Sequence, residues 1–167
     1  MYDRLTESDI KKMEEEIEYR RLVVRKQALE AVKEARAQGD LSENFEYHAA
    51  KKDKNKNESR IRYLEKMIRT ARIVSDESGE NEVGLNNVVE VYFEDDDETE
   101  TYKLVTTIRG NSLAGMISID SPLGRAIVHH RVNDRVYVKI DEKRGYYVVI
   151  RSIDKSVGDE EDRIRKF

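Results

Sequence analysis

The chain has 167 residues, which is enough for one domain or for two small ones. Apolar residues make up 38% of it and charged residues 40%, a balance that is polar for one compact core and typical of a coiled coil joined to a small globular domain. The formal net charge of -4 gives no overall attraction to nucleic acid or membranes, and the absence of cysteine excludes disulfides, thiolate nucleophiles and cysteine-ligated zinc.

The first predicted element is a long helix. Thr6 followed three residues later by Asp9 matches a capping box and predicts that the helix begins near Thr6. Apolar residues then recur at steps of three and four as far as Ala35, with a gap at Arg20 and Arg21. Gly39 is the expected stop signal.

A second helix is predicted from Tyr47 to Ala71, where seam positions recur with heptad spacing. Lys54 and Asn57 are polar members of this seam, so we expect looser packing in the half of the hairpin nearer the connection. At about 30 residues and 1.5 Å per residue, each helix would be roughly 45 Å long. The short connection predicts an antiparallel hairpin, whose tip would present residues 39–47 far from any core.

The second half of the chain changes to a strand-like pattern. Ser75–Glu82 is polar and contains a glycine, as linkers do. Short β-branched and aromatic runs predict strands, and Ser121 with Pro122 predicts the start of one short helix. The predicted strands are Val88–Phe93, Tyr102–Ile108, Met116–Ile119, Val136–Ile140 and Tyr146–Ile153.

These elements predict an α+β protein, with a helical hairpin followed by a small antiparallel sheet packed on a helix. The predicted boundaries are a hairpin at residues 1–75, a linker at 76–86, a sheet domain at 87–154 and a charged tail at 155–167. The tail is expected to be either loose or a short helix.

Two acids at the predicted tip, Asp40 and Glu43, are the first candidates for chemistry. One interpretation is helix capping, because Asp40 can accept from the amides that open the second helix and Glu43 follows at a box-like spacing. The other is metal binding, because hard carboxylate oxygens suit Mg²⁺, which proteins commonly hold with one or two carboxylates. Two carboxylates on a tip cannot form a closed site, but they can complete one inside a partner.

Basic residues are concentrated on the second helix. One interpretation is a solvated face balanced by the many glutamates of the hairpin. The other is a stripe that contacts nucleic-acid phosphates. The candidates for such contacts include Lys51, Lys52, Arg60, Arg62 and Arg69.

Other kinds of site have little support. His48, His129 and His130 do not have the spacing of metal ligands, and the chain contains no glycine-rich phosphate loop, nucleophile elbow or triad. Residues 1–4 open neither a signal peptide nor a transmembrane run, so we expect a soluble cytoplasmic protein with no membrane partner.

Two separated motifs now carry a resemblance to the bacterial Gre transcript-cleavage factors, of the GreA/GreB type. The first is the tip, Gly39–Asn44 followed by Glu46–Ala50. The second is Ser121–Ile127 followed by Val132–Asp134, which is similar to the short helix of that family's C-terminal domain. The likeness runs from about residue 5 to residue 153.

The resemblance implies a transcription elongation factor that binds backtracked bacterial RNA polymerase. Its FKBP-like C-terminal domain would dock at the rim of the polymerase's secondary channel, with Ser121, Pro122, Leu123, Gly124 and Arg125 as candidate contacts. The coiled coil would extend down the channel, where Asp40 and Glu43 would help to hold a Mg²⁺ shared with the polymerase. Asn44 and Tyr47 would support the shape of the tip.

On this reading the protein has no enzymatic activity of its own and binds no metal tightly when free. It stimulates the polymerase's own cleavage of the nascent RNA 3′ end, and it is expected to be a monomer. A channel-blocking inhibitor of the same shape remains an alternative, although the retained Asp40 and Glu43 favour cleavage. A prolyl isomerase is a further alternative that fold alone would not establish.

Overall fold

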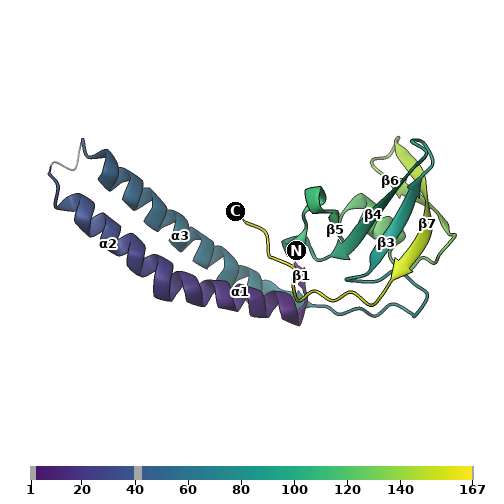
Figure 1. Ribbon diagram of the computed structural model, residues 1–167, viewed down its shortest axis with the longest axis horizontal. Coiled ribbons are helices and arrows are strands. Elements are labelled where there is room, and N and C mark those ends of the chain that lie inside the picture. The colour runs from purple at the N-terminus through teal and green to yellow at the C-terminus, as the bar shows by residue number, and fades with distance from the viewer. Residues whose placement is uncertain (1–2, 40–42, 167) are drawn as a thin grey trace. The chain divides into compact units, whose positions relative to one another are not determined.

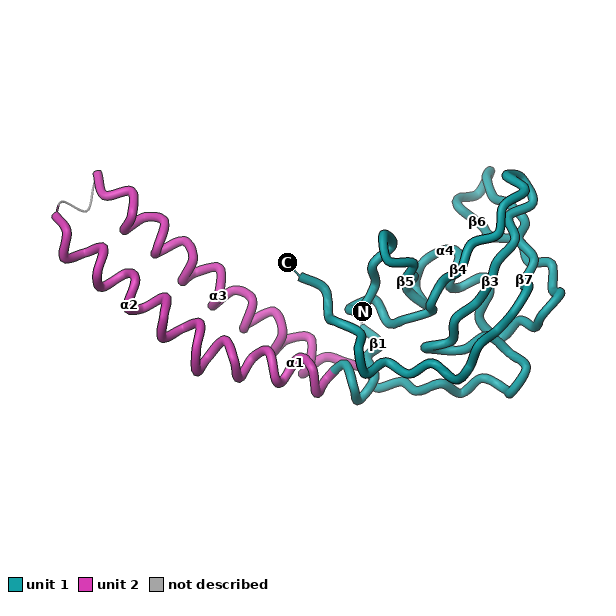
Figure 2. The backbone as a smooth tube through the Cα atoms, viewed as in Figure 1, with its two compact units in different colours: residues 1–9, 72–166 teal, residues 10–71, 167 magenta. Residues whose placement is uncertain are grey.

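The computed structural model describes residues 3–39 and 43–166. They form two compact units, a helical hairpin of residues 10–71 and a sheet unit of residues 3–9 and 72–166 (Figures 1 and 2). The expected α+β class is confirmed. No helix in the described part of the chain is both long enough and apolar enough to cross a lipid bilayer.

The hairpin consists of two helical arms. The first arm contains α1 (Glu7–Tyr19), the π-helical segment η1 (Arg20–Val24) and α2 (Arg25–Arg36), and the second arm is α3 (Phe45–Thr70). The predicted capping box at the start of α1 is confirmed, because the Thr6 amide donates to Asp9 Oδ2 at 2.9 Å and the Asp9 amide donates to Thr6 Oγ1 at 3.1 Å.

The gap in the apolar pattern at Arg20 and Arg21 coincides with η1, in which no residue is buried. The seam is closed there by polar groups, since Asn57 Nδ2 donates to the Arg20 carbonyl at 3.3 Å and Arg20 Nη1 donates to Asn57 Oδ1 at 3.0 Å. Asn57 is therefore only 3% exposed, although looser packing was expected at this polar seam position. The side-chain amide of Asn57 can be buried because its oxygen and its nitrogen each have a hydrogen-bond partner.

A second polar contact crosses the seam beside Asn57. Glu16 accepts from Arg20 Nε and from Arg60 Nε, each at 2.8 Å, and Arg60 is 3% exposed. Burial alone would raise the pKa of Glu16, but the hydrogen bonds from Arg60 and Arg20 outweigh it and lower that pKa below its ordinary 4.5.

This lowered pKa makes the hairpin sensitive to acid. The unfolded chain takes up a proton at Glu16 more readily than the folded chain, so the contribution of Glu16 is complete above pH 4.5 and is lost as pH falls through the folded pKa. Replacing Glu16 by Gln should cost about 1–2 kcal/mol at neutral pH. Urea unfolding followed by circular dichroism should show this difference shrinking as pH falls below 4.5. If the stability difference between the wild type and Glu16→Gln does not change with pH, the lowered pKa of Glu16 is contradicted. Glu30→Gln, at an exposed position, is the control.

The sheet unit contains five strands in the order β5-β4-β3-β7-β6. The sheet is mostly antiparallel, as expected, with three antiparallel pairings. Strands β4 and β5 run parallel, because two short 3-10 turns (η2, Thr107–Arg109, and η3, Ser112–Ala114) return the chain to the same direction. Helix α4 (Pro122–Ile127) contributes Leu123 and Ile127 to a core formed with strand residues such as Val91 and Ile150. The strands are β3 (Val88–Phe93), β4 (Glu98–Val105), β5 (Met116–Ser118), β6 (Arg135–Lys139) and β7 (Gly145–Asp154).

Segments outside the predicted strands also belong to the sheet unit. Strand β1 (Arg4–Leu5) pairs in parallel with β2 (Arg72–Ile73), which brings the first residues of the chain into this unit. Val83 and Leu85, both in the expected linker, are buried in its core. The hairpin was predicted at residues 1–75, whereas the observed hairpin unit covers residues 10–71. The predicted linker, residues 76–86, belongs to the sheet unit.

The charged tail has no helix within its described residues and is fastened to the sheet unit. Lys155 Nζ donates to the Glu82 carbonyl at 2.7 Å, and the Arg165 amide donates to the Ile108 carbonyl at 2.6 Å. Asp162 accepts from Lys103 Nζ and from Arg109 Nη1, each at 2.8 Å. The hydrogen bonds from Lys103 and Arg109 outweigh burial and lower the pKa of Asp162.

Candidate functional site

The candidate site is the tip of the hairpin, where the two arms are joined (Figure 1). Glu43 is exposed there and lies immediately before Asn44, the N-cap of α3. Asp40, the other acid singled out in the sequence, lies outside the described residues. The tip thus presents at least one solvated carboxylate beside the first turn of a long helix.

Asn44 joins the two arms at this point. Its Oδ1 accepts from the Tyr47 amide at 3.0 Å, which caps α3, and its Nδ2 donates to the Ala35 carbonyl of α2 at 2.6 Å. The capping interpretation of Asp40 lies outside the described residues. Glu43 does not hold the cap position, because α3 begins at Phe45 and its N-cap is Asn44. Glu43 is therefore fixed in place through its neighbour rather than by capping the helix itself.

Tyr47 closes the seam behind the cap. It is buried, and the Arg36 guanidinium lies 5.6 Å from the centre of its ring. The Arg36 side chain also lowers the pKa of the Tyr47 phenol through a hydrogen bond. These contacts are consistent with the tip-supporting role predicted for Asn44 and Tyr47.

The double role of Asn44 can be separated by two substitutions. Asn44→Ala removes both hydrogen bonds and is expected to lower the free energy of unfolding of the hairpin by about 1–2 kcal/mol. Asn44→Asp keeps the acceptor that caps α3 but lacks the donor to Ala35, so its loss should be smaller. Urea unfolding followed by circular dichroism measures both, and equal losses for the two variants would show that the cap contributes nothing.

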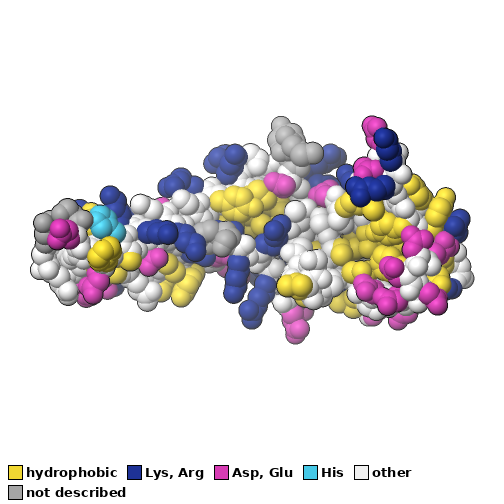
Figure 3. All heavy atoms as spheres, turned by 90° about the horizontal axis from the view of Figure 1, so that it is seen from above, with side chains coloured by type: hydrophobic (Ala, Val, Ile, Leu, Met, Phe, Trp, Pro, Cys, Tyr) yellow, Lys and Arg dark blue, Asp and Glu magenta, His cyan; other side chains and the backbone are white. Residues whose placement is uncertain are grey.

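The predicted basic contacts divide into two groups. Lys51, Lys52, Arg62 and Arg69 are exposed, and Figure 3 shows several Lys and Arg side chains spread along the hairpin. Arg60 is instead buried against Glu16, so the structure places it in the seam. Four of the five candidates are therefore exposed to solvent, and Arg60 instead holds the two arms together.

The donor set at the tip suits Mg²⁺ only as part of a shared site. Glu43 supplies an exposed carboxylate, which is the oxygen donor that Mg²⁺ prefers, and would need further ligands from elsewhere to hold the ion. Among residues 3–39 and 43–166, no three His, Asp or Glu side chains are grouped as metal ligands. Glu43 therefore fits a site that is completed by other groups.

The second sequence motif, which begins with Ser121–Ile127, contributes mainly to folding. Ser121 Oγ accepts from the Gly124 amide at 3.0 Å and caps α4, while Leu123 is buried in the core. A Cβ on Gly124 would lie 2.1 Å from the Ser118 carbonyl oxygen, so only glycine fits there. Pro122 and Arg125 are the two exposed members. Of the five docking candidates, these two remain available for contact with a partner.

One functional candidate was not identified from the sequence, a groove on the hairpin beside η1. Leu22 in this segment is 65% exposed, although its residue type suggested burial. The available signal was the gap in the apolar pattern at Arg20 and Arg21, because an interrupted period can mark a π-helical segment.

Comparisons with known proteins agree on one family. A family model described as "Transcription elongation factor, N-terminal" matches residues 4–73, and one described as "Transcription elongation factor, GreA/GreB, C-term" matches residues 77–160. The transcription elongation factor GreA of Bacillus subtilis (strain 168) is 38% identical over 135 residues, which cover 81% of this chain and 86% of that protein. GreA of Agrobacterium fabrum is 40% identical over 136 residues, with 80% and 85% covered. The solved structure of the transcription factor Gfh1 is 27% identical and covers 92% of this chain and 97% of its own, with a TM-score of 0.45.

Proposed function

The chain belongs to the GreA/GreB family of transcription elongation factors, and from this premise we propose that it rescues backtracked bacterial RNA polymerase. In this proposal the hairpin enters the polymerase's secondary channel and the tip stimulates the polymerase's own cleavage of the nascent RNA 3′ end. The factor has no nuclease activity alone, acts as a monomer in the cytoplasm, and binds no metal tightly when free.

The observation that carries the proposal is the exposed Glu43 carboxylate, held at the end of a rigid hairpin by Asn44. Helix α3 has 26 residues, so it spans roughly 39 Å at 1.5 Å per residue. A hairpin of this length can carry a carboxylate to an active site deep inside a partner. The bond from Asn44 to Ala35 keeps the ends of the two arms together, which limits how far the carboxylate can move.

In the polymerase, Glu43 together with Asp40 would contribute oxygen ligands to a Mg²⁺ that the polymerase's own acids also hold. When bound, the metal would act as a Lewis acid that lowers the pKa of a water molecule and orients it toward the phosphodiester. The tip carboxylates position that site, because each adds negative charge and an oxygen donor at the end of the hairpin. Water alone is the nucleophile in this scheme.

The exposed cations on α3 would guide the RNA. Lys51, Lys52, Arg62 and Arg69 can neutralise phosphates of the extruded 3′ segment, and such contacts weaken as salt concentration rises. Pro122 and Arg125 would contribute to docking of the sheet unit on the polymerase surface.

The decisive experiment uses a bacterial elongation complex held in a backtracked state, with end-labelled RNA and Mg²⁺. Adding the protein should shorten the RNA and restore elongation. Slowed elongation without shortening would replace the proposal with a channel-blocking inhibitor. If the protein neither binds nor affects the complex, the polymerase is not its partner.

A further inference from the structure

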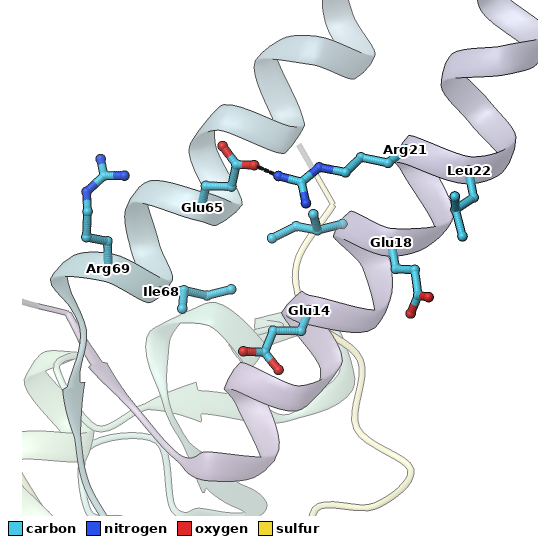
Figure 4. Close-up of a pocket in the computed structure, with 8 residues that line it drawn as sticks. Glu14, Glu18, Arg21, Leu22, Glu65, Ile68 and Arg69 are labelled. Atoms are coloured by element: carbon cyan, nitrogen blue, oxygen red, sulfur yellow. Dashed lines mark hydrogen bonds and ion pairs between the residues drawn. The ribbon is translucent and has the colours of Figure 1, made fainter.

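The hairpin carries a groove between its two arms, on the side away from the tip (Figure 4). Its volume is about 550 Å³, and its apolar lining consists of Ile17, Leu22 and Ile68. Ile17 is buried, and Figure 4 shows Ile68 pointing from α3 toward α1. Arg69 is the one lining residue to which the proposed function above gives a role.

The groove results from the local sequence. The π-helical segment Arg20–Val24 contributes no buried residue to the seam, and Leu22 within it faces solvent. Exposed leucines that occur singly on a surface are ordinary, but Leu22 lies beside a concave apolar surface and within a π-helical turn. Single π-helical turns inside α-helices frequently occur at functional sites.

The charges around the groove indicate what it would accept. Glu14 and Glu18 are exposed on the α1 side, and Arg21 is paired with Glu65 across the groove (Figure 4). Arg69 is the exposed cation of the α3 side. Whereas Arg69 lies on the opposite wall, the two carboxylates of the α1 wall repel nucleic-acid phosphates and attract Lys or Arg. They also disfavour a symmetric dimer through this face, because each acidic wall would meet its own copy.

We propose that this groove binds an amphipathic helix of a partner protein, with apolar side chains placed between the arms and Lys or Arg side chains against Glu14 and Glu18. A groove between two antiparallel helices accepts side chains spaced three and four residues apart, as a third helix presents them. The inference rests on the proposed function in one respect, that the helix belongs to the RNA polymerase.

Two exposed leucines of the same hairpin provide a matched test. Leu22 lines the groove and is 65% exposed, whereas Leu29 on α2 is 47% exposed and lies outside it. Leu22→Gln should weaken binding to the polymerase elongation complex about tenfold, as loss of an apolar anchor does, and Leu29→Gln should change it less than about twofold. Equal affinities for the two variants would overturn the inference. Circular dichroism verifies that each variant is folded.

Charge reversal tests the acidic wall. Glu18→Lys should weaken binding, while Glu34→Lys, an exposed acid farther along the same arm, should not. A photoreactive residue at position 22 should crosslink to a polymerase subunit, and a crosslink to RNA or to a second copy of the chain would overturn the inference. If the wild-type protein binds and cleaves but Leu22→Gln binds equally well, only the groove proposal fails. If the wild type does not bind polymerase, the proposed function fails as well.

Discussion

Replacing Glu43 by Gln is expected to reduce stimulated RNA cleavage on the order of 100-fold while leaving polymerase binding nearly unchanged. The substitution removes one negative charge from the reacting centre, and losing a single positioned electrostatic contact commonly costs a factor of this size. Binding should persist because Glu43 is exposed at the tip and contributes to neither buried core. Single-turnover cleavage in a backtracked elongation complex, measured at saturating factor, isolates the chemical effect from affinity.

The neighbouring Glu46→Gln variant is the control, because Glu46 is also exposed but lies in the first turn of α3, beyond the cap. It should retain cleavage. Asp40→Asn should behave like Glu43→Gln if both acids share the metal. Equal losses of cleavage and binding in Glu43→Gln would assign the residue to docking, and normal cleavage would remove it from the site.

The sequence predicted the hairpin well because its signals are local. The Thr6 and Asp9 pair, the heptad seam and Gly39 each act within a few residues of one another, and the observed arms begin and end close to them. The burial of Asn57 was not predictable in this way. It depends on a carbonyl of Arg20 on the opposite arm, and composition alone ranks Asn as a poor seam residue.

The cap at the tip shows a different limit. Asp40, Asn44 and Ser42 are all residue types that cap helices, and spacing rules place a helix start only to within a few residues. The structure selects Asn44 because its amide can also reach Ala35 on the other arm. That second contact is a tertiary feature, and no pattern within residues 39–47 contains it.

The strands were likewise predictable from β-branched runs, but the network that joins the chain ends to them was not. Arg109 directly follows the predicted strand Tyr102–Ile108, and the sequence alone suggests an exposed charged side chain. Its partners are Asp9 and Asp162, near opposite ends of the chain, so only the folded topology brings them together.

Replacing Arg109 by Met is expected to destabilise the sheet unit by about 3–5 kcal/mol, the largest stability effect expected here. The side chains of Arg109 and Asp9 are both 0% exposed and their Nε and Oδ1 atoms are 2.6 Å apart. Arg109 Nη1 also reaches Asp162 Oδ2 and Asn86 Oδ1, each at 2.8 Å. The variant would leave the Asp9 carboxylate buried without its cation, and the tail without one of its attachments.

The exposed Arg131 supplies the control for this substitution. Its Nη2 lies 4.0 Å from Glu82 Oε2, and 65% of its side chain is exposed. Arg131→Met should therefore lower the free energy of unfolding by less than about 0.5 kcal/mol. Adding Asp9→Asn to Arg109→Met should recover part of the loss, because the buried negative charge is removed while an amide oxygen at position 9 can still accept from the Thr6 amide. Urea unfolding of the wild type, Arg109→Met, Asp9→Asn and the double variant completes a double-mutant cycle. Similar losses for Arg109→Met and Arg131→Met would mean that the buried pair does not hold the chain ends to the sheet.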